Sequence, residues 1–258
     1  MSGATDTSAG RVVVITGAAG GMGRATARLL AARGVRLVLV DIDETGAEET
    51  RAAVPAGIDA IVAVADVTDA EQVAGYVEAA LRVYGRIDGF FNNAAYEGAI
   101  CPLDDYPLDD FQRIVDINIR GVFLGLRAVL PVMRRQGLGS IVNVSSQAGL
   151  RGVANLSVYS ASKHAVLGLS AAAALEAAAD GVCVNTICPG PTATPMLKKL
   201  EYLIRAQGGD PESFLKRIPV GRYGQPEEIG TLVTWLLTDA PRFLTGAVIA
   251  IDGGMTLP

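Results

Sequence analysis

The stretch from Arg11 to Gly23 reads Arg11-Val-Val-Val-Ile-Thr-Gly-Ala-Ala-Gly-Gly-Met-Gly23. Its first half is a short apolar run rich in β-branched residues, which predicts a strand buried on both faces, as in a parallel sheet. Residues 24–33 have a helical pattern, so the glycines lie between a strand and a helix. Backbone N–H groups and the helix dipole at such a turn can bind a phosphate. The stretch therefore predicts the first unit of a parallel α/β fold with an anion-binding turn.

The glycine spacing after Thr16 is Gly-x-x-x-Gly-x-Gly, at Gly17, Gly21 and Gly23. Glycines at a strand-to-helix turn let a pyrophosphate approach the main chain closely. The spacing differs from Gly-x-Gly-x-x-Gly and from the Walker loop, which ends in Gly-Lys-Ser/Thr. The predicted cofactor contacts of this turn are Gly17, Gly20, Gly21, Met22 and Gly23, and a purely structural glycine turn is the alternative.

A second apolar strand, residues 36–40, ends in Asp41 and Ile42. In a dinucleotide-binding fold, an acid at this position holds the adenosine ribose hydroxyls. A 2′-phosphate about 4 Å from the carboxylate would be repelled by about 4 kcal/mol at an effective dielectric constant of 20. No lysine or arginine stands at position 20 or 42 to offset that repulsion. Asp41 therefore predicts NAD, with NADP the less favoured cofactor.

The rest of the chain continues to alternate apolar strands with helices. We expect further strands at 60–64, 87–91, 140–145 and 182–187, and helices at 70–84 and 108–135. This alternation predicts one α/β domain over residues 11–258: a Rossmann-type, doubly wound parallel β-sheet flanked by helices, preceded by a flexible N-terminus at residues 1–10. Ligands of such sheets bind beyond the carboxyl ends of the strands. The residues expected to converge there are Gly17, Asp41, Asp66, Asn92, Ser146 and Pro189.

Tyr159 and Lys163 are four residues apart, so on a helix their side chains lie on one face. An ammonium close to a phenol favours the phenolate and lowers the phenol's pKa. The pair would then act as an acid/base near neutral pH. The alternative is a helix that carries two amphipathic side chains.

Composition excludes several functional classes. Half of the 258 residues are hydrophobic and 19% are charged, which is typical of a globular protein. The net charge of −5 disfavours nucleic acid or an anionic membrane as a partner. No signal-peptide pattern or membrane-length apolar run is present, so we expect a cytoplasmic protein. Three scattered cysteines and a single histidine predict no metal site.

Together, these residues resemble the short-chain dehydrogenase/reductase family, in its branch of single-domain chains of similar length. The resemblance covers nearly the whole chain, and one departure is Ala95, where the family usually has glycine. The motifs that carry it are Thr16-Gly17-x-x-x-Gly21-x-Gly23, Asn92-Asn93-Ala94, Asn118, Ser146, Tyr159-x-x-x-Lys163 and Pro189-Gly190.

The resemblance implies four catalytic residues. Tyr159 would be the general acid/base on the substrate oxygen, and Ser146 would hydrogen-bond that oxygen. Lys163 would lower the phenol's pKa and hold the nicotinamide ribose, and Asn118 would support a water-mediated proton relay to Lys163.

The resemblance also implies cofactor contacts. Pro189, Gly190 and Thr192 would seat the nicotinamide carboxamide, although a structural turn is the alternative for Thr192, and Asn92 would contact the ribose region. The other predicted contacts are Ile42, Asp66, Val67 and Ala94.

Residues 191–224 correspond to the family's flexible lid over the substrate. The apolar residues of this segment, with Tyr96, Ile100 and Leu150, predict a pocket for an uncharged ketone or secondary alcohol. The predicted substrate contacts are Tyr96, Gln147 and Met196. Several passages, Glu97-Gly98 among them, look most like the levodione reductase-like subgroup, whose members reduce cyclic ketones and diones.

Two other functions remain open. A 3-oxoacyl-carrier-protein reductase would normally use NADPH and basic residues near the pocket mouth, which Asp41 and the acidic composition disfavour. A non-catalytic dinucleotide-binding protein would usually lack the Tyr or the Lys of the motif. The resemblance further implies a homotetramer formed through the helices at 108–135 and 159–179.

Overall fold

The fold is organised around one parallel sheet of seven strands. A computed structural model describes residues 8–206 and 208–257. The strand order is β3-β2-β1-β4-β5-β6-β7, with every neighbouring pair parallel. The chain crosses from one half of the sheet to the other between β3 and β4, which places the switch point beside β1. The strands are β1 (Val12–Thr16), β2 (Arg36–Asp41), β3 (Ala60–Val64), β4 (Gly89–Asn92), β5 (Gly139–Val144), β6 (Val182–Pro189) and β7 (Val248–Ile251).

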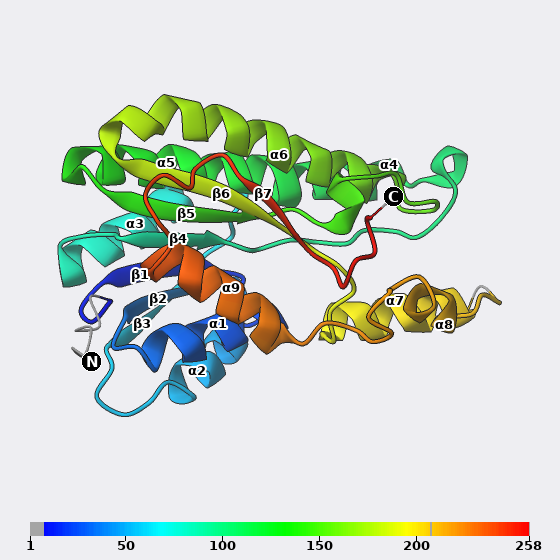
Figure 1. The fold of residues 1–258 in the computed structure, drawn as a ribbon, viewed down its shortest axis with the longest axis horizontal. Helices are drawn as coiled ribbons and strands as arrows, with labels where there is room; N and C mark the ends of the chain where they lie inside the picture. The colour runs from blue at the N-terminus through cyan, green and yellow to red at the C-terminus, as the bar shows by residue number, and fades with distance from the viewer. Residues whose placement is uncertain (1–7, 207, 258) are drawn as a thin grey trace.

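Helices cover both faces of this sheet (Figure 1). One face carries α3 (Ala70–Tyr84), α4 (Leu108–Ile114), α5 (Gly121–Gln136) and α6 (Ser157–Ala177); the other carries α1 (Gly21–Ala31), α2 (Glu44–Ala52) and α9 (Pro226–Thr238). Alternate residues of β1 pack into two hydrophobic cores, one on each face of the sheet. Val12 and Val14 pack toward α3 and α5, whereas Val13 and Ile15 pack toward α1 and α9. The prediction of a doubly wound parallel sheet is confirmed. Short 3₁₀ turns lie at η1 (Leu103–Asp105), η3 (Gln147–Gly149) and η4 (Ala178–Asp180).

The helix expected at 108–135 contains an irregular turn. A π-helical segment, η2 (Val115–Arg120), separates α4 from α5. Such segments insert an extra residue per turn and occur frequently at functional sites. Asn118 lies within this segment and is completely buried.

The flexible N-terminus expected at residues 1–10 is only partly described. Residues 1–7 lie outside the described residues. Residues 8–10 form a hydrogen-bonded turn: the buried Ser8 donates to the Arg33 carbonyl, and the Gly10 N–H donates to the Gly34 carbonyl. Backbone groups just beyond α1 therefore hold residues 8–10, and the flexibility expected of the N-terminus stays a prediction.

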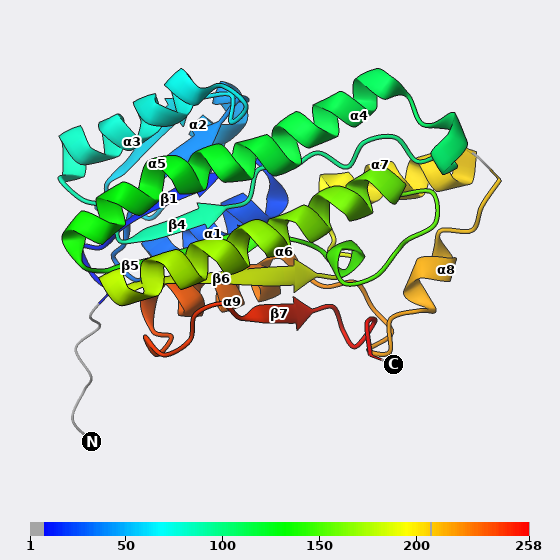
Figure 2. The same cartoon turned by 90° about the horizontal axis from the view of Figure 1, so that it is seen from above.

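The expected lid segment leaves the sheet between β6 and α9. It contains α7 (Pro195–Ala206) and α8 (Glu212–Leu215), which lie beyond the carboxyl ends of the strands (Figure 2). Its two ends are joined, since the Ala193 N–H donates to the Gly224 carbonyl and Thr192 bridges to Gly224. In the described part of the chain, no helix has both the length and the apolar character needed to span a bilayer.

Candidate active site

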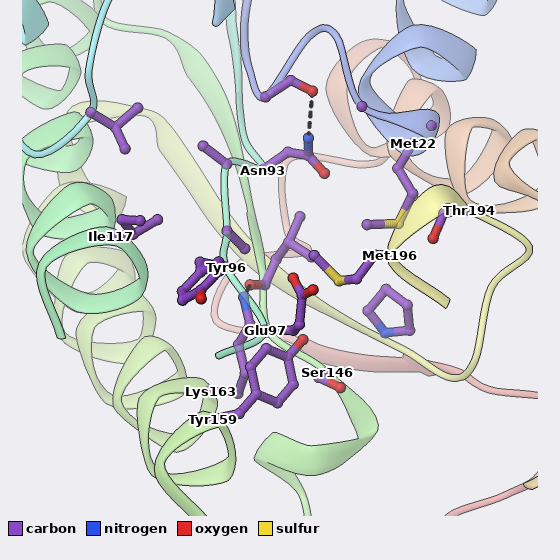
Figure 3. Close-up of a pocket in the computed structure, with 18 of the residues that line it drawn as sticks. Met22, Asn93, Tyr96, Glu97, Ile117, Ser146, Tyr159, Lys163, Thr194 and Met196 are labelled. Atoms are coloured by element: carbon purple, nitrogen blue, oxygen red, sulfur yellow. Dashed lines mark hydrogen bonds between the residues drawn. The ribbon is translucent and has the colours of Figure 1, made fainter. Parts of the chain in front are cut away.

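A cavity of about 1010 Å³ opens at the carboxyl ends of the strands (Figure 3). It runs from the glycine turn and the end of β2 to α6 and the lid helix α7. Eighteen of the predicted site residues line it, whereas Gly23, Asn92 and Asn118 do not. The eighteen are Gly17, Gly20, Gly21, Met22, Asp41, Ile42, Asp66, Val67, Ala94, Tyr96, Ser146, Gln147, Tyr159, Lys163, Pro189, Gly190, Thr192 and Met196.

The glycine turn forms a cradle for an anion. Gly17 has a φ of +67°, a backbone conformation that side chains disfavour. The α1 N-cap, Gly20, provides no side-chain hydrogen bond, so the first N–H groups of the helix are left for a ligand. A diphosphate accepts hydrogen bonds and carries the charge that this helix end favours, so it fits the cradle.

Gly23 has a packing role instead of a lining role. A Cβ at this position would lie 2.2 Å from the Gly17 carbonyl oxygen and 3.0 Å from the Ala18 Cα. Because both atoms belong to the backbone, an added methyl group would push α1 away from the turn. Gly23 thus determines how closely the helix N-terminus approaches the cradle.

Gly23→Ala tests this close packing. We expect a loss of about 1–3 kcal/mol in the free energy of unfolding, as for other overpacked interiors, together with weaker dinucleotide binding. Gly75→Ala is the matched control, because a Cβ there meets nothing within 4 Å and α3 should gain about 0.5–1 kcal/mol. Urea unfolding measures the free energy of unfolding of both variants. Equal values for Gly23→Ala and Gly75→Ala would contradict the packing role of Gly23.

Asp41 lies at the end of β2, where its carboxylate contacts the glycine turn. One carboxylate oxygen accepts from the Ala19 N–H at 2.9 Å, and the other accepts from the Asp43 N–H at 3.0 Å. The carboxylate is thereby fixed at the cavity wall with lone pairs left for hydroxyl donors. Among the described lining residues, the only cations are Arg113 and Lys163, and neither comes from the β2 end. This donor set fits the ribose diol of NAD and opposes a 2′-phosphate.

The structure corrects the prediction for Asn92. Its side chain is 3% exposed and donates to the Asn143 Oδ1 and the Val122 carbonyl, each at 3.1 Å. Asn92 and Asn143 are register partners in β4 and β5, so both side chains point away from the cavity toward α5 and α6. The Asn92 side chain therefore supports the core and does not line the cavity.

The neighbouring Asn93 lines the cavity, although the sequence motifs did not assign it to the site. Its Nδ2 donates to the carbonyls of Thr16 and Gly17, which fixes the glycine turn against β4. Its Oδ1 is buried and has no hydrogen-bond partner among the described residues. The strand alternation could have identified it, because consecutive residues face opposite sides.

Asn118 lies behind the cavity wall. Its amide accepts from the Tyr96 N–H and donates to the Tyr96 carbonyl, both at 2.8 Å. It also donates to the Ser162 Oγ at 3.0 Å, within the helix that carries Tyr159 and Lys163. These bonds fix the loop after β4 relative to α6, and the proton relay remains a prediction.

Tyr159, Ser146 and Lys163 gather on one side of the cavity (Figure 3). Lys163 is 1% exposed; its Nζ donates to the Val144 carbonyl at 3.0 Å and lies 5.6 Å from the centre of the Tyr159 ring. The Ser146 hydroxyl oxygen accepts from the Ala148 N–H at 3.1 Å, and the same hydroxyl forms a hydrogen bond with Tyr159. The three groups can therefore act on one substrate oxygen.

The expected low pKa of Tyr159 is not found in this structure. Burial raises the pKa of Tyr159 to about 12, partly offset by a hydrogen bond with Ser146, and the Glu97 charge raises it further. Burial lowers the pKa of Lys163 to about 8. The direction is opposite to the prediction that Lys163 lowers the pKa of the phenol, because burial is the largest influence on Tyr159.

The substrate end is less apolar than the sequence suggests. Met196, Leu197 and Leu200 of α7 line it as expected, but Ile100 and Leu150 do not. Glu97 also lines it, and its carboxylate forms an ion pair at 2.7 Å with Lys199 of α7. Sequence alone gave no reason to bring these two residues together.

Comparisons with known proteins establish the family. A family model described as "Enoyl-(Acyl carrier protein) reductase" matches residues 17–256. The levodione reductase of Leifsonia aquatica is 43% identical over 95% of this chain and 94% of its own length. The chain belongs to the short-chain dehydrogenase/reductase family. The predictions of an oxidoreductase that acts on CH–OH groups and uses NAD are confirmed.

Other relatives and two solved structures agree with this family membership. The cis-4-hydroxycyclohexanecarboxylate dehydrogenase of Sinomonas cyclohexanicum is 40% identical over 95% of this chain and 96% of its own. The crystal structure of levodione reductase has a TM-score of 0.91 at 43% identity, covering 95% and 97% of the two chains. A structure of NAD⁺-bound xylitol dehydrogenase has a TM-score of 0.92 at 38% identity, covering 96% and 100%.

Proposed function

We propose that this protein interconverts a cyclic, largely apolar ketone and the corresponding secondary alcohol, with Tyr159 as the general acid/base. The observation that carries this proposal is the shared cavity: Tyr159, Ser146 and Lys163 line the same space as the glycine cradle and Asp41. A nicotinamide held in this cavity would supply or accept the hydride, while the protein orients the substrate and moves the proton.

The arrangement of these side chains supports the following proton step. In ketone reduction, the Tyr159 hydroxyl donates its proton to the carbonyl oxygen, and the Ser146 hydroxyl donates a hydrogen bond to the same oxygen. In alcohol oxidation, the phenolate accepts that proton. Lys163 uses one N–H on the Val144 carbonyl, so its remaining donors can hold the nicotinamide ribose.

A cyclic substrate is supported by the cavity and by the relatives. Met196, Leu197 and Leu200 supply apolar surface opposite the catalytic group, which suits a compact ring. Two relatives are named for levodione and cis-4-hydroxycyclohexanecarboxylate, the second a six-membered ring. The fold itself serves many substrates, so the proposal depends on these cavity residues.

The two alternatives have less support. A 3-oxoacyl-carrier-protein reductase using NADPH would place a phosphate against Asp41, where the described lining residues offer no cation. A non-catalytic dinucleotide-binding protein would not need Tyr159, Ser146 and Lys163 together at the cavity wall.

A turnover assay tests the proposal. NADH and NADPH are each combined with cyclic ketones and diones, aryl ketones, steroid ketones and an acetoacetyl thioester, with Tyr159→Phe as the blank. We expect NADH-dependent reduction of a cyclic ketone. NADPH-dependent reduction confined to the thioester would assign the protein to acyl-chain chemistry and overturn the proposal.

The Glu97–Lys199 ion pair provides a pH test of the same site. The Glu97 charge raises the pKa of Tyr159, and Lys199 offsets that charge. Lys199→Met should therefore raise the pKa of Tyr159 and move the rise of alcohol oxidation to higher pH, because oxidation needs the phenolate. Glu97→Gln should move it to lower pH.

Profiles of initial oxidation rate against pH measure both shifts. Lys199→Arg is the matched control, because it retains the positive charge opposite Glu97 and should leave the profile close to that of the wild type. Movement of the Lys199→Met profile to lower pH would contradict this electrostatic role.

We further propose a homotetramer formed through α5 and α6. Both helices expose large apolar side chains, Phe123 at 47% and Leu175 at 85%, which a subunit contact would cover. Light scattering on the purified protein tests this, and a monomer at micromolar concentration would contradict it.

A further inference from the structure

Gln147 carries an amide whose orientation is fixed by its neighbour. It follows Ser146 in the chain, is 6% exposed and lines the cavity. Its Oε1 accepts a hydrogen bond from the Arg151 Nε at 3.0 Å. A guanidinium group only donates, so the oxygen of the amide must face Arg151 and the NH₂ must face the other way.

The NH₂ group of Gln147 has no hydrogen-bond partner among the described residues. Buried polar groups are normally paired, and an unpaired donor that borders a cavity is available to a ligand. The aliphatic residues of α7 in the cavity wall cannot accept a hydrogen bond from it. The substrate end therefore contains one oriented donor in addition to Tyr159 and Ser146.

Arg151 itself has few partners. Its Nη2 is buried without a hydrogen-bond partner in the described part of the chain, and it does not line the cavity. Arg151 can therefore affect a substrate only indirectly, through its hydrogen bond to Gln147. A charged donor on the amide oxygen polarises the amide and strengthens its N–H groups as donors.

We infer that Gln147 is a specificity-determining residue whose amide N–H donates to a second acceptor oxygen of the substrate, and that Arg151 is the positioning residue that holds the amide in this orientation. This inference rests on the proposed function. The substrate class that it names is the cyclic ketone with a further acceptor oxygen, such as a ring dione. An unsubstituted cycloalkanone leaves the amide donor unpaired and binds less well.

The test compares 1,4-cyclohexanedione with cyclohexanone under NADH. The two ketones differ in intrinsic reactivity and in their number of carbonyl groups, but these differences are the same for every variant. We therefore divide kcat/KM for the dione by kcat/KM for the monoketone. This ratio is then compared between the wild type and each variant. We expect Gln147→Leu to lower this ratio about tenfold, chiefly through the KM for the dione, as for one lost hydrogen bond.

Two further variants separate positioning from folding. Arg151→Met should lower the ratio in the same direction, because the freed amide can rotate, and Arg151→Lys should restore part of it. Gln147→Glu should lower the ratio most, because it presents an acceptor to the substrate's second oxygen. A purely structural role would reduce kcat/KM for both ketones in parallel and leave the ratio unchanged.

The outcomes distinguish this inference from the proposed function. If both ketones are reduced, Tyr159→Phe is inactive and the ratio is the same in Gln147→Leu and the wild type, the inference about Gln147 is overturned while the proposed function stands. If neither ketone is reduced, the proposed function fails, and the inference fails with it. A drop in the ratio with Gln147→Leu and Arg151→Met supports both.

Discussion

Replacing Tyr159 with phenylalanine is expected to lower kcat by about 10²–10⁴-fold, the usual contribution of a positioned acid/base. The ring remains in its place beside Lys163, so packing and dinucleotide binding should change little. What disappears is the only proton donor that we assign to the substrate oxygen. Tyr202→Phe is the matched control, because the Tyr202 side chain is 70% exposed on α7.

Steady-state kinetics and a fluorescence titration with NADH measure the two parts of this prediction. Tyr159→Phe should bind NADH with an affinity close to that of the wild type and turn over extremely slowly. A variant that retained more than about a tenth of the wild-type kcat would show that Tyr159 does not supply the proton, since a tenfold effect is below that range.

The pH dependence of the wild-type protein follows from the same residue. Because the pKa of Tyr159 is raised to about 12, the phenol stays protonated through the neutral range. Ketone reduction needs the protonated form, so Tyr159 supports it at every pH below that value. Alcohol oxidation needs the phenolate and should rise with increasing pH. An oxidation rate that fell between neutral and mildly alkaline pH would contradict the assignment.

Replacing Asp41 with alanine is expected to reduce the preference for NAD over NADP by about 10³-fold. This value corresponds to about 4 kcal/mol of repulsion between a carboxylate and a phosphate at an effective dielectric constant of 20. Part of the change should be weaker NAD binding, because the variant loses an acceptor for the ribose. The Ala19 N–H also loses its partner, so the glycine turn is held less firmly.

The kcat/KM values for NADH and NADPH, measured with one ketone, give this preference directly. Asp43→Ala is the matched control: it removes a carboxylate two residues away, where the side chain caps α2 by accepting from the Gly46 N–H. If Asp41→Ala and Asp43→Ala changed the ratio of NADH to NADPH kcat/KM equally, the overall negative charge would set the cofactor preference. An unchanged ratio in Asp41→Ala would refute its role as the discriminator.

Much of the fold and site could be predicted because the signals are local in the chain. The apolar β-branched run of β1 is followed directly by the glycines, and the apolar run of β2 is followed directly by its acid, so each signal spans only a few residues. Repeated strand-helix alternation then dictates a parallel sheet, and a parallel sheet gathers its strand ends at one edge. This is why the sequence alone predicts that residues as distant as Gly17 and Pro189 border one cavity.

Other features were decided only in three dimensions. Asn92 and Asn93 are adjacent and chemically identical, yet one joins the core beside Asn143 and the other borders the cavity, because the strand register determines which way each side chain faces. The ion pair of Glu97 and Lys199 requires the lid helix to lie over the loop after β4.

The protonation state of Tyr159 shows most clearly which properties follow from the sequence and which depend on the folded structure. The four-residue spacing to Lys163 determined that phenol and ammonium share one face of a helix. It could not determine that both would be desolvated, so that the pKa of Tyr159 is raised to about 12 and that of Lys163 is lowered to about 8. Motif spacing is a property of the chain alone, whereas solvation and charge at a site depend on residues that only the folded structure brings together.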